Sequence, residues 1–203
     1  KVRGLATITL TVTLACGVGF GASRASMGIV TSSLPFSISD TIVEGDGTVL
    51  EGESVTASNL PARIELLSGE RYLVGIGSRV TVEKNELVLE GGSVRVQEVT
   101  AAKTPVSVRN LRFVPVANDA DFEVFMDSHE EASVTVHTGK VSIRREDGTQ
   151  LQLISAGQAT LIAKVGDRYV TDAERAPMEI TRIQTRQVEE LAKWEQASRR
   201  KGT

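Results

Sequence analysis

The sequence has little of the chemistry that catalytic and metal-binding sites use. Cysteine occurs once, at Cys16, inside an apolar run near the start of the chain. The rest of the chain can therefore form no disulfide and no cysteine-based zinc site. Histidine occurs twice. His129 lies in the polar segment 127–131, which fits a hairpin turn better than a metal site, and His137 is expected to be an exposed strand residue.

Aromatic residues make up only 4% of the chain, whereas hydrophobic residues make up 40%. A hydrophobic core is therefore possible, but it must be built mainly from Val, Leu and Ile, which pack well on pleated sheets. The formal net charge is −3 and the isoelectric point is about 5.6. This balance gives no overall basic field, so we expect no nucleic-acid partner.

Common enzyme motifs are also missing from the sequence. The nucleophile elbow G-x-S-x-G does not occur, and residues 75–80 fail the dinucleotide fingerprint after their first two glycines. Acidic pairs such as Asp119 with Asp121, and Glu130 with Glu131, are typical of β turns, whereas a glycosidase needs two carboxylates across a cleft. We expect no enzyme activity, no catalytic residue, no metal and no cofactor.

The N-terminal residues predict export. Lys1 and Arg3 form a short positive region, and residues 4–20 are apolar or small and carry no charge. Ser23-Arg24-Ala25 then resembles a small-residue cleavage site. This layout is typical of a secretory signal peptide over residues 1–25, which is the interpretation that we favour.

Two alternatives concern the fate of this apolar segment. Residues 4–22 are about long enough to stay uncut as a membrane anchor. A lipoprotein signal ending at Cys16 is less well supported, because Thr13 matches its first position poorly. In each case the protein is expected in the periplasm or on the extracytoplasmic face of the inner membrane, and the segment is its expected membrane contact.

Residues 26–171 have the pattern of an all-β domain. Short runs alternate apolar and polar residues, and this period of two predicts half-buried strands. Turn residues separate the runs, and no long helical period interrupts them, which argues against alternating strands and helices. Alternating runs begin at Val80, Leu87, Val94, Val106, Val134, Val141 and Leu151.

A weak internal repeat favours stacked rungs. Its form is apolar-x-apolar, two residues, Gly, one residue and apolar-x-apolar, and residues 87–96 and 134–143 fit it with identical offsets. Partial copies start at Ile64 and Leu151. The starts at 64, 87 and 134 are separated by about one and about two units of roughly 23 residues. We therefore expect a β-solenoid-like fold, with a β-sandwich or barrel as the alternative.

The C-terminal region, residues 172–203, differs in character. A polar linker containing Pro177 precedes a predicted amphipathic α-helix over residues 178–201. One face of this helix gathers large apolar side chains, namely Ile180, Ile183, Val188, Leu191 and Trp194. We expect this face to cap an open end of the β domain, and docking in a groove of a partner protein is the alternative.

Six segments of the β domain stand in a recognisable order. They are Gly52-Glu-Ser-Val-Thr-Ala-Ser, Arg63-Ile-Glu-Leu-Leu-Ser-Gly69, Gly77-Ser-Arg-Val80, the runs 87–96 and 134–143, and Leu153-Ile-Ser-Ala-Gly-Gln158. They lie within residues 52–163, and this stretch resembles the FecR periplasmic domain family. One departure is clear, because the family usually has Gly-Thr ahead of a Phe-x-Val strand. This chain has Asp119-Ala-Asp before Phe122, so that part is expected to be shaped differently.

The resemblance implies a role as well as a fold. FecR-like proteins act in iron-uptake signalling, where a periplasmic β-solenoid domain receives a signal from an outer-membrane transporter. A transmembrane helix joins that domain to a cytoplasmic segment that controls a sigma factor. The sequence contains the domain and an apolar segment but no sigma-binding segment, so the transducer role is not expected to carry over as a whole.

The favoured hypothesis is a non-enzymatic, exported cell-envelope protein of FecR type that binds another protein, serves as a scaffold or senses a signal. Its recognition surface would be strand edges and a sheet face, not a pocket. One alternative is the extracytoplasmic part of a transmembrane sigma-factor regulator. Another is a surface carbohydrate-active β-helix, since β-helices host polysaccharide lyases, although aromatic residues for a sugar platform are few.

Overall fold

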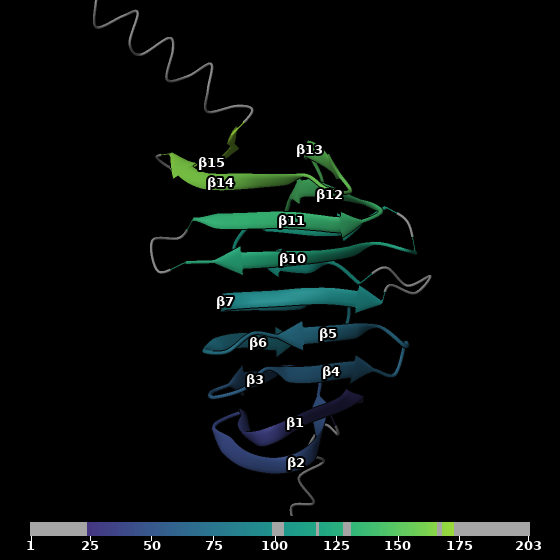
Figure 1. Cartoon of the computed structure of the whole chain (residues 1–203), viewed down its shortest axis with the longest axis vertical. Helices are drawn as coiled ribbons and strands as arrows, with labels where there is room; N and C mark the ends of the chain where they lie inside the picture. Colours follow the sequence, from purple (N-terminus) through teal and green to yellow (C-terminus); the bar gives the residue numbers. More distant parts are fainter. Residues whose placement is uncertain (1–23, 99–103, 117, 128–130, 166–167, 173–203) are drawn as a thin grey trace, which may run out of the picture.

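The computed structural model describes residues 24–98, 104–116, 118–127, 131–165 and 168–172. The predicted signal or anchor segment and the predicted C-terminal helix therefore lie almost wholly outside the described residues. Within the described residues, no helix is long and apolar enough to cross a membrane. The described elements are all strands, which confirms the predicted all-β class. They lie crosswise to the long axis of the molecule (Figure 1).

The strands are distributed along the whole described part of the chain. In chain order they are β1 (Ser26–Ile38), β2 (Thr41–Leu50), β3 (Glu53–Ala57), β4 (Ala62–Leu66), β5 (Arg71–Val74), β6 (Ser78–Val82), β7 (Leu87–Glu98), β8 (Val106–Val108), β9 (Leu111–Pro115), β10 (Asp121–Met126), β11 (Ala132–Thr138), β12 (Lys140–Arg145), β13 (Gln150–Ser155), β14 (Ala159–Val165) and β15 (Arg168–Thr171).

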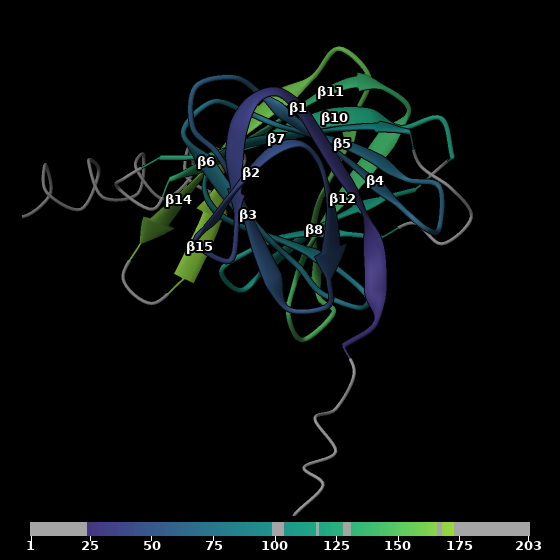
Figure 2. The same ribbon diagram turned by 90° about the horizontal axis from the view of Figure 1, so that it is seen from below.

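Strands from the N-terminal half close into a six-stranded barrel. Antiparallel pairing runs from β1 to β3, β6, β7, β5 and β4, and then returns to β1. Closure depends on two long strands that change partners along their length. β1 pairs with β4 through residues 28–31 and with β3 through residues 37–38. β7 pairs with β6 through residues 87–91 and with β5 through residues 94–98. Figure 2 shows the strands curving around a common centre.

β7 also begins two further arms of the sheet. Residues 92–96 of β7 pair with β10, and β11, β14 and β15 follow in order. Residues 87–88 of β7 pair with β8, and β9, β12 and β13 follow. The β7–β8 ladder is the one parallel ladder among the described strands. β2 therefore lies at one end of the molecule, and β13 and β15 lie at the other (Figure 1).

The predicted β-solenoid is wrong, and the barrel that was its alternative describes the fold. A solenoid stacks successive rungs, whereas here neighbouring strands form antiparallel ladders and a ring closes on itself. The repeat has another origin, because its glycine marks a corner in both full copies. Gly92 lies in β7 where the strand changes partners, and Gly139 separates β11 in one arm from β12 in the other. Their φ angles are 83° and 73°.

The Gly92 corner packs against a buried serine of another strand, Ser78. Ser78 is buried, and its Oγ accepts a hydrogen bond from the N–H of Ser93 at 2.7 Å. A Cβ atom added at Gly92 would lie 2.8 Å from Ser78 Cα, closer than real Cβ atoms approach. The serine of residues 77–80 and the glycine of residues 87–96 therefore form one tightly packed corner.

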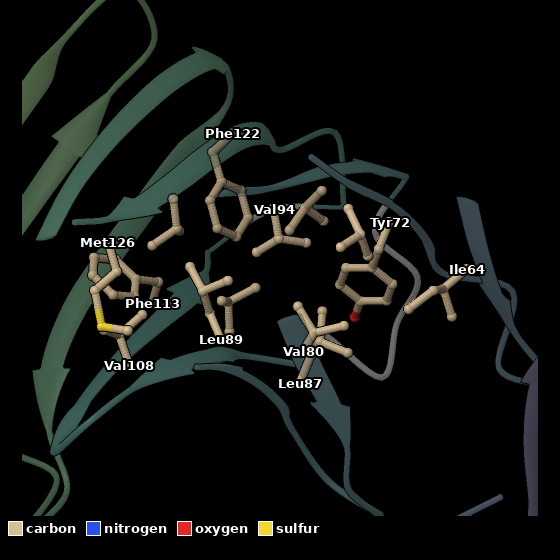
Figure 3. Close-up of a cluster of buried hydrophobic side chains, with 14 of the residues drawn as sticks. Ile64, Tyr72, Val80, Leu87, Leu89, Val94, Val108, Phe113, Phe122 and Met126 are labelled. Atoms are coloured by element: carbon tan, nitrogen blue, oxygen red, sulfur yellow. The ribbon is translucent and has the colours of Figure 1, made fainter. Parts of the chain in front are cut away.

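One hydrophobic core runs through the barrel and the arms. Val, Leu and Ile supply most of it, as the composition predicted, and the aromatic contributions are Phe36, Tyr72, Phe113, Phe122 and Tyr169. In Figure 3, Leu89 and Val94 of β7 lie between Tyr72 on one side and Phe113 and Phe122 on the other. The shared strand β7 therefore joins the two parts through side chains as well as through hydrogen bonds.

Candidate protein interaction surface

Strand edges are the most accessible backbone of an all-β protein. Among the described residues, β2, β13 and β15 each pair with a single neighbouring strand. The free side of such a strand presents unpaired N–H and C=O groups, which can template pairing with another chain. β15 leads directly into residues outside the description, so β2 and β13 are the edges whose surroundings can be compared.

The β2 edge carries features that discourage pairing. Glu44 and Asp46 are exposed acidic residues in the middle of this strand. Gly45 lies between them with a φ of 79°, a left-handed conformation that interrupts a regular ladder. Charges and local irregularity on an edge are the devices by which natural sheets avoid association. We therefore regard β2 as a protected edge.

The β13 edge has neither a charged residue nor a proline. Its sequence is Gln-Leu-Gln-Leu-Ile-Ser over residues 150–155, and Leu153 is 45% exposed. The one irregularity of its pairing with β12 lies at the start of the strand, so residues 152–155 keep a regular register. An exposed apolar side chain on an uncharged edge is the combination that favours association with another strand.

The backbone of Leu153 faces the free side of this edge. The N–H of Ser155 donates to Oε1 of Gln158 within the following turn, at 2.9 Å, and not to β12. Hydrogen-bonding direction alternates along an antiparallel strand, so the N–H and C=O of Leu153 also point away from β12. An incoming strand could therefore bond to Leu153 without breaking an existing ladder.

The buried carboxylate of Glu70 supports the fold. Glu70 is 1% exposed, and its Oε1 accepts a hydrogen bond from the N–H of Thr104 at 2.9 Å. Its Oε2 accepts from the hydroxyls of Thr104 at 2.8 Å and Ser68 at 2.6 Å. Burial, followed by the charge of Glu70, raises the pKa of Tyr72, against a smaller opposite effect of Thr104, so the phenol stays neutral. These bonds tie the β4–β5 turn to the segment before β8.

The acidic residues that the sequence placed near a turn are held by local contacts. Both carboxylate oxygens of Asp121 accept hydrogen bonds from Arg95 of the neighbouring strand, at 2.8 and 2.7 Å. The backbone carbonyl of Asp119 accepts a hydrogen bond from the hydroxyl of Thr138 at 2.6 Å. Asp119 and Asp121 thus fix the chain at the start of β10.

The remaining residues considered in the sequence are the two histidines and the apolar face of the predicted C-terminal helix. His137 is exposed on β11, as its place in the strand predicts, and His129 lies outside the described residues. Within the described residues, no group of three or more His, Cys, Asp or Glu side chains could hold a metal ion. The face predicted to cap the domain or to bind a partner, Ile180, Ile183, Val188, Leu191 and Trp194, lies outside the described residues.

Sequence reasoning proposed strand edges as the recognition surface but did not single out β13. The signal was present, because residues 150–155 lack the charges found in residues 41–50. The sequence pattern does not show which strands pair with each other. The pairing makes β13 the last strand of its arm, whereas the similarly alternating β10 is bonded on both sides.

No protein-family model matches the chain, and no curated protein matches it. Two crystal structures of a protein from Parabacteroides distasonis, whose assignment as an anti-sigma factor is provisional, share 13% sequence identity with this chain. Each match has a TM-score of 0.47 and covers 59% of this chain and 58% of that one. The match thus spans little more than half of either protein, and a likeness this distant carries no argument about function.

Proposed function

We propose that the chain is a non-enzymatic, exported module of the cell envelope that binds another protein by strand addition to the free edge of β13. The single observation that carries the binding mode is the uncharged edge around Leu153, with its outward-facing backbone and exposed side chain. Strand addition gains affinity from main-chain hydrogen bonds and specificity from alternate side chains. The FecR-like segments and the signal-like N-terminal residues support the envelope location.

A matched pair of edge variants tests the binding mode. Leu153→Lys places a charge on the β13 edge, at a half-exposed position where the fold should tolerate it. Ile42→Lys is the control, because Ile42 is 73% exposed on the other edge strand, β2. Each tagged protein is cross-linked in the envelope of its native cell and purified. We expect the wild type and Ile42→Lys to retain the same partner and Leu153→Lys to lose it. Recovery of the same partner in equal amounts by all three proteins would show that the β13 edge does not bind it.

Two further measurements address the location and the alternative role. N-terminal sequencing of the protein from cell fractions distinguishes cleavage after Ala25 from a retained anchor. Recovery in the cytoplasmic fraction would contradict the envelope proposal. If the recovered partner is an outer-membrane transporter, the alternative of a sigma-factor regulator is favoured over a general binding module.

The fold removes the basis for the carbohydrate-active alternative. It rested on the comparison with β-helices, whose stacked parallel rungs hold polysaccharide lyase sites. The described strands form antiparallel ladders around a closed barrel instead. We therefore do not carry that alternative further.

A further inference from the structure

The outward face of the β12–β13 hairpin carries positive charge beside the free edge. Lys140 and Arg144 are exposed on β12, and strand alternation places them on the same face as Ser142, which lies between them. In the ladder, Ser142 lies opposite Leu153, and Lys140 lies opposite Ser155. Residues that lie opposite each other share a face of the sheet. The uncharged strand β13 is therefore bordered by two cations on the face that exposes Leu153.

The charge of these two cations is not neutralised within the described residues. Neither forms an ion pair with a described carboxylate, whereas Arg112, opposite Arg144 on β9, pairs with Glu86 at 3.2 Å. Arg144 is also held in position, because its Nε donates a hydrogen bond to Oγ of Ser142 at 3.2 Å. Since Ser142 lies opposite Leu153, this bond draws the guanidinium toward the middle of the edge strand.

The two cations make a second copy of this chain a poor occupant of the edge. If two β13 strands paired antiparallel about Leu153, opposite residues would share a face, so the cations of both copies would lie on one side of the joined sheet. Like charges across paired strands are destabilising, and lysine near an edge is one means by which sheets avoid joining to each other. The same charge favours a strand that carries carboxylates.

We propose that the strand added to β13 is acidic, with an apolar residue opposite Leu153 and a carboxylate two residues away on either side. This inference rests on the strand addition proposed above and names the chemistry of its partner. The central residue bonds to the backbone of Leu153 and packs against its exposed side chain. The carboxylates share that face, because side chains two residues apart point the same way.

The geometry of the hairpin brings such carboxylates within reach of the cations. Two strand spacings, about 10 Å, separate β12 from an added strand. A lysine and a glutamate side chain bridge that span together. Ser155, the residue between Lys140 and the added strand, has a small side chain that leaves room for the lysine to extend across β13. Arg144 already leans toward the middle of the edge.

Two labelled synthetic peptides test this assignment on the full-length protein by fluorescence anisotropy. The acidic peptide is Thr-Glu-Thr-Val-Thr-Glu-Thr, and the basic peptide has lysine at both glutamate positions. We expect the acidic peptide to bind more tightly, with a preference that weakens as salt is added. Leu153→Pro should abolish its binding, because proline removes the outward N–H without changing the charge of the edge. An acidic peptide N-methylated at its central valine blocks the same pairing from the other strand, and it replaces Leu153→Pro if that variant alters the circular dichroism.

A matched pair of lysine variants tests the role of the charge. Lys140→Glu should weaken binding of the acidic peptide roughly two- to thirtyfold, because the attraction of an exposed ion pair becomes a repulsion of similar size. The same variant should strengthen binding of the basic peptide. Lys84→Glu is the control, because it changes the net charge equally at an exposed position before β7, and β8, β9 and β12 separate β7 from β13. We expect Lys84→Glu to change neither affinity.

Several results would overturn the acidic assignment. They are equal binding of the two peptides, no binding of either, and an affinity for the acidic peptide that Lys140→Glu leaves unchanged. Self-association that Leu153→Pro abolishes would assign the edge to a second copy of the chain. Binding to phosphatidylglycerol vesicles that Lys140→Glu abolishes, without a preference between the peptides, would assign the basic face to lipid.

Failure of this inference is distinguishable from failure of strand addition itself. Strand addition fails if Leu153→Lys keeps the partner that is cross-linked in the cell envelope. If Leu153→Lys loses that partner while Lys140→Glu and Lys84→Glu retain it equally, strand addition stands and the acidic assignment is wrong.

Discussion

Gly139 and Gly157 offer a direct test of how the corners shape this fold. Their φ angles are nearly equal, 73° and 77°, and both belong to the left-handed region that favours glycine. Their surroundings differ. A Cβ atom at Gly139 would lie 2.8 Å from Ala120 Cα, whereas a Cβ atom at Gly157 would meet nothing within 4 Å. Alanine at each position therefore shares the cost of the φ angle, and only Gly139→Ala adds a collision with backbone.

The expected magnitudes follow from these two contributions. A left-handed φ costs an L-residue about 1–2 kcal/mol, and this applies to both variants. Overpacking adds about 1–3 kcal/mol for Gly139→Ala alone. Relief is limited because the hydroxyl of Thr138 donates to the carbonyl of Asp119, which fixes the segment that carries Ala120. The lower entropy of the unfolded alanine chain is common to both variants and cancels in their difference.

Urea unfolding of the full-length variants, followed by circular dichroism, measures the difference. Gly139→Ala should lower the free energy of unfolding by about 1–3 kcal/mol more than Gly157→Ala does, at an unchanged dependence on urea. Gly92→Ala and Gly52→Ala repeat the comparison, since Gly92 contacts Ser78 and Gly52 has open space. Equal losses within either pair would show that the φ angle alone explains the glycines and that the corners are not tightly packed.

Three other predictions concern a buried phenol, a buried carboxylate and a turn. Stability should fall as the pH rises above about 10, because the unfolded phenol ionises there while the raised pKa of Tyr72 keeps the folded phenol protonated. Tyr72→Phe should flatten this alkaline loss in urea titrations, and an equally steep profile would refute it. Glu70→Ala should cost about 2–4 kcal/mol, because the N–H of Thr104 loses its acceptor, and Glu70→Gln should cost less. Equal costs for these two variants would show that hydrogen bonding is not the cause. Ser39 and Asp40 have φ angles of 45° and 68° in the β1–β2 turn, so replacing them with Asn-Gly should raise stability by about 1 kcal/mol. A loss of stability would mean that contacts of the native side chains outweigh the strain.

Local patterns predicted the strands well because alternation is a local property. Strands β6, β8, β11 and β12 contain the runs that began at Val80, Val106, Val134 and Val141. The β1–β2 turn shows the limit of this reasoning. Ser39 and Asp40 adopt positive φ angles without a glycine, so the two strands look like one irregular segment in the sequence. Turn chemistry that departs from the usual residues cannot be read without the structure.

The candidate edge shows the same limit at a larger scale. Whether Leu153 faces a free edge depends on which strand lies beside β13, and that neighbour is set by pairings between distant parts of the chain. A pattern within residues 150–155 can show that an edge would be unprotected there, but not that an edge exists.

The confusion of a barrel with a solenoid has a definite physical cause. Both folds can use a residue with a left-handed φ where a strand turns a corner, and both need apolar residues at alternate positions on either side of it. Gly92 and Gly139 meet this requirement at two corners of different kinds. At Gly92 one strand, β7, changes its neighbours, and at Gly139 the chain crosses from one arm to the other. The repeat therefore predicts where the chain bends, while the choice of partner after each bend depends on loop lengths and on packing against side chains such as Ser78 and Ala120. Substitutions that fill these corners should accordingly lower the free energy of unfolding more than substitutions at open turns, and the glycine series above measures this difference.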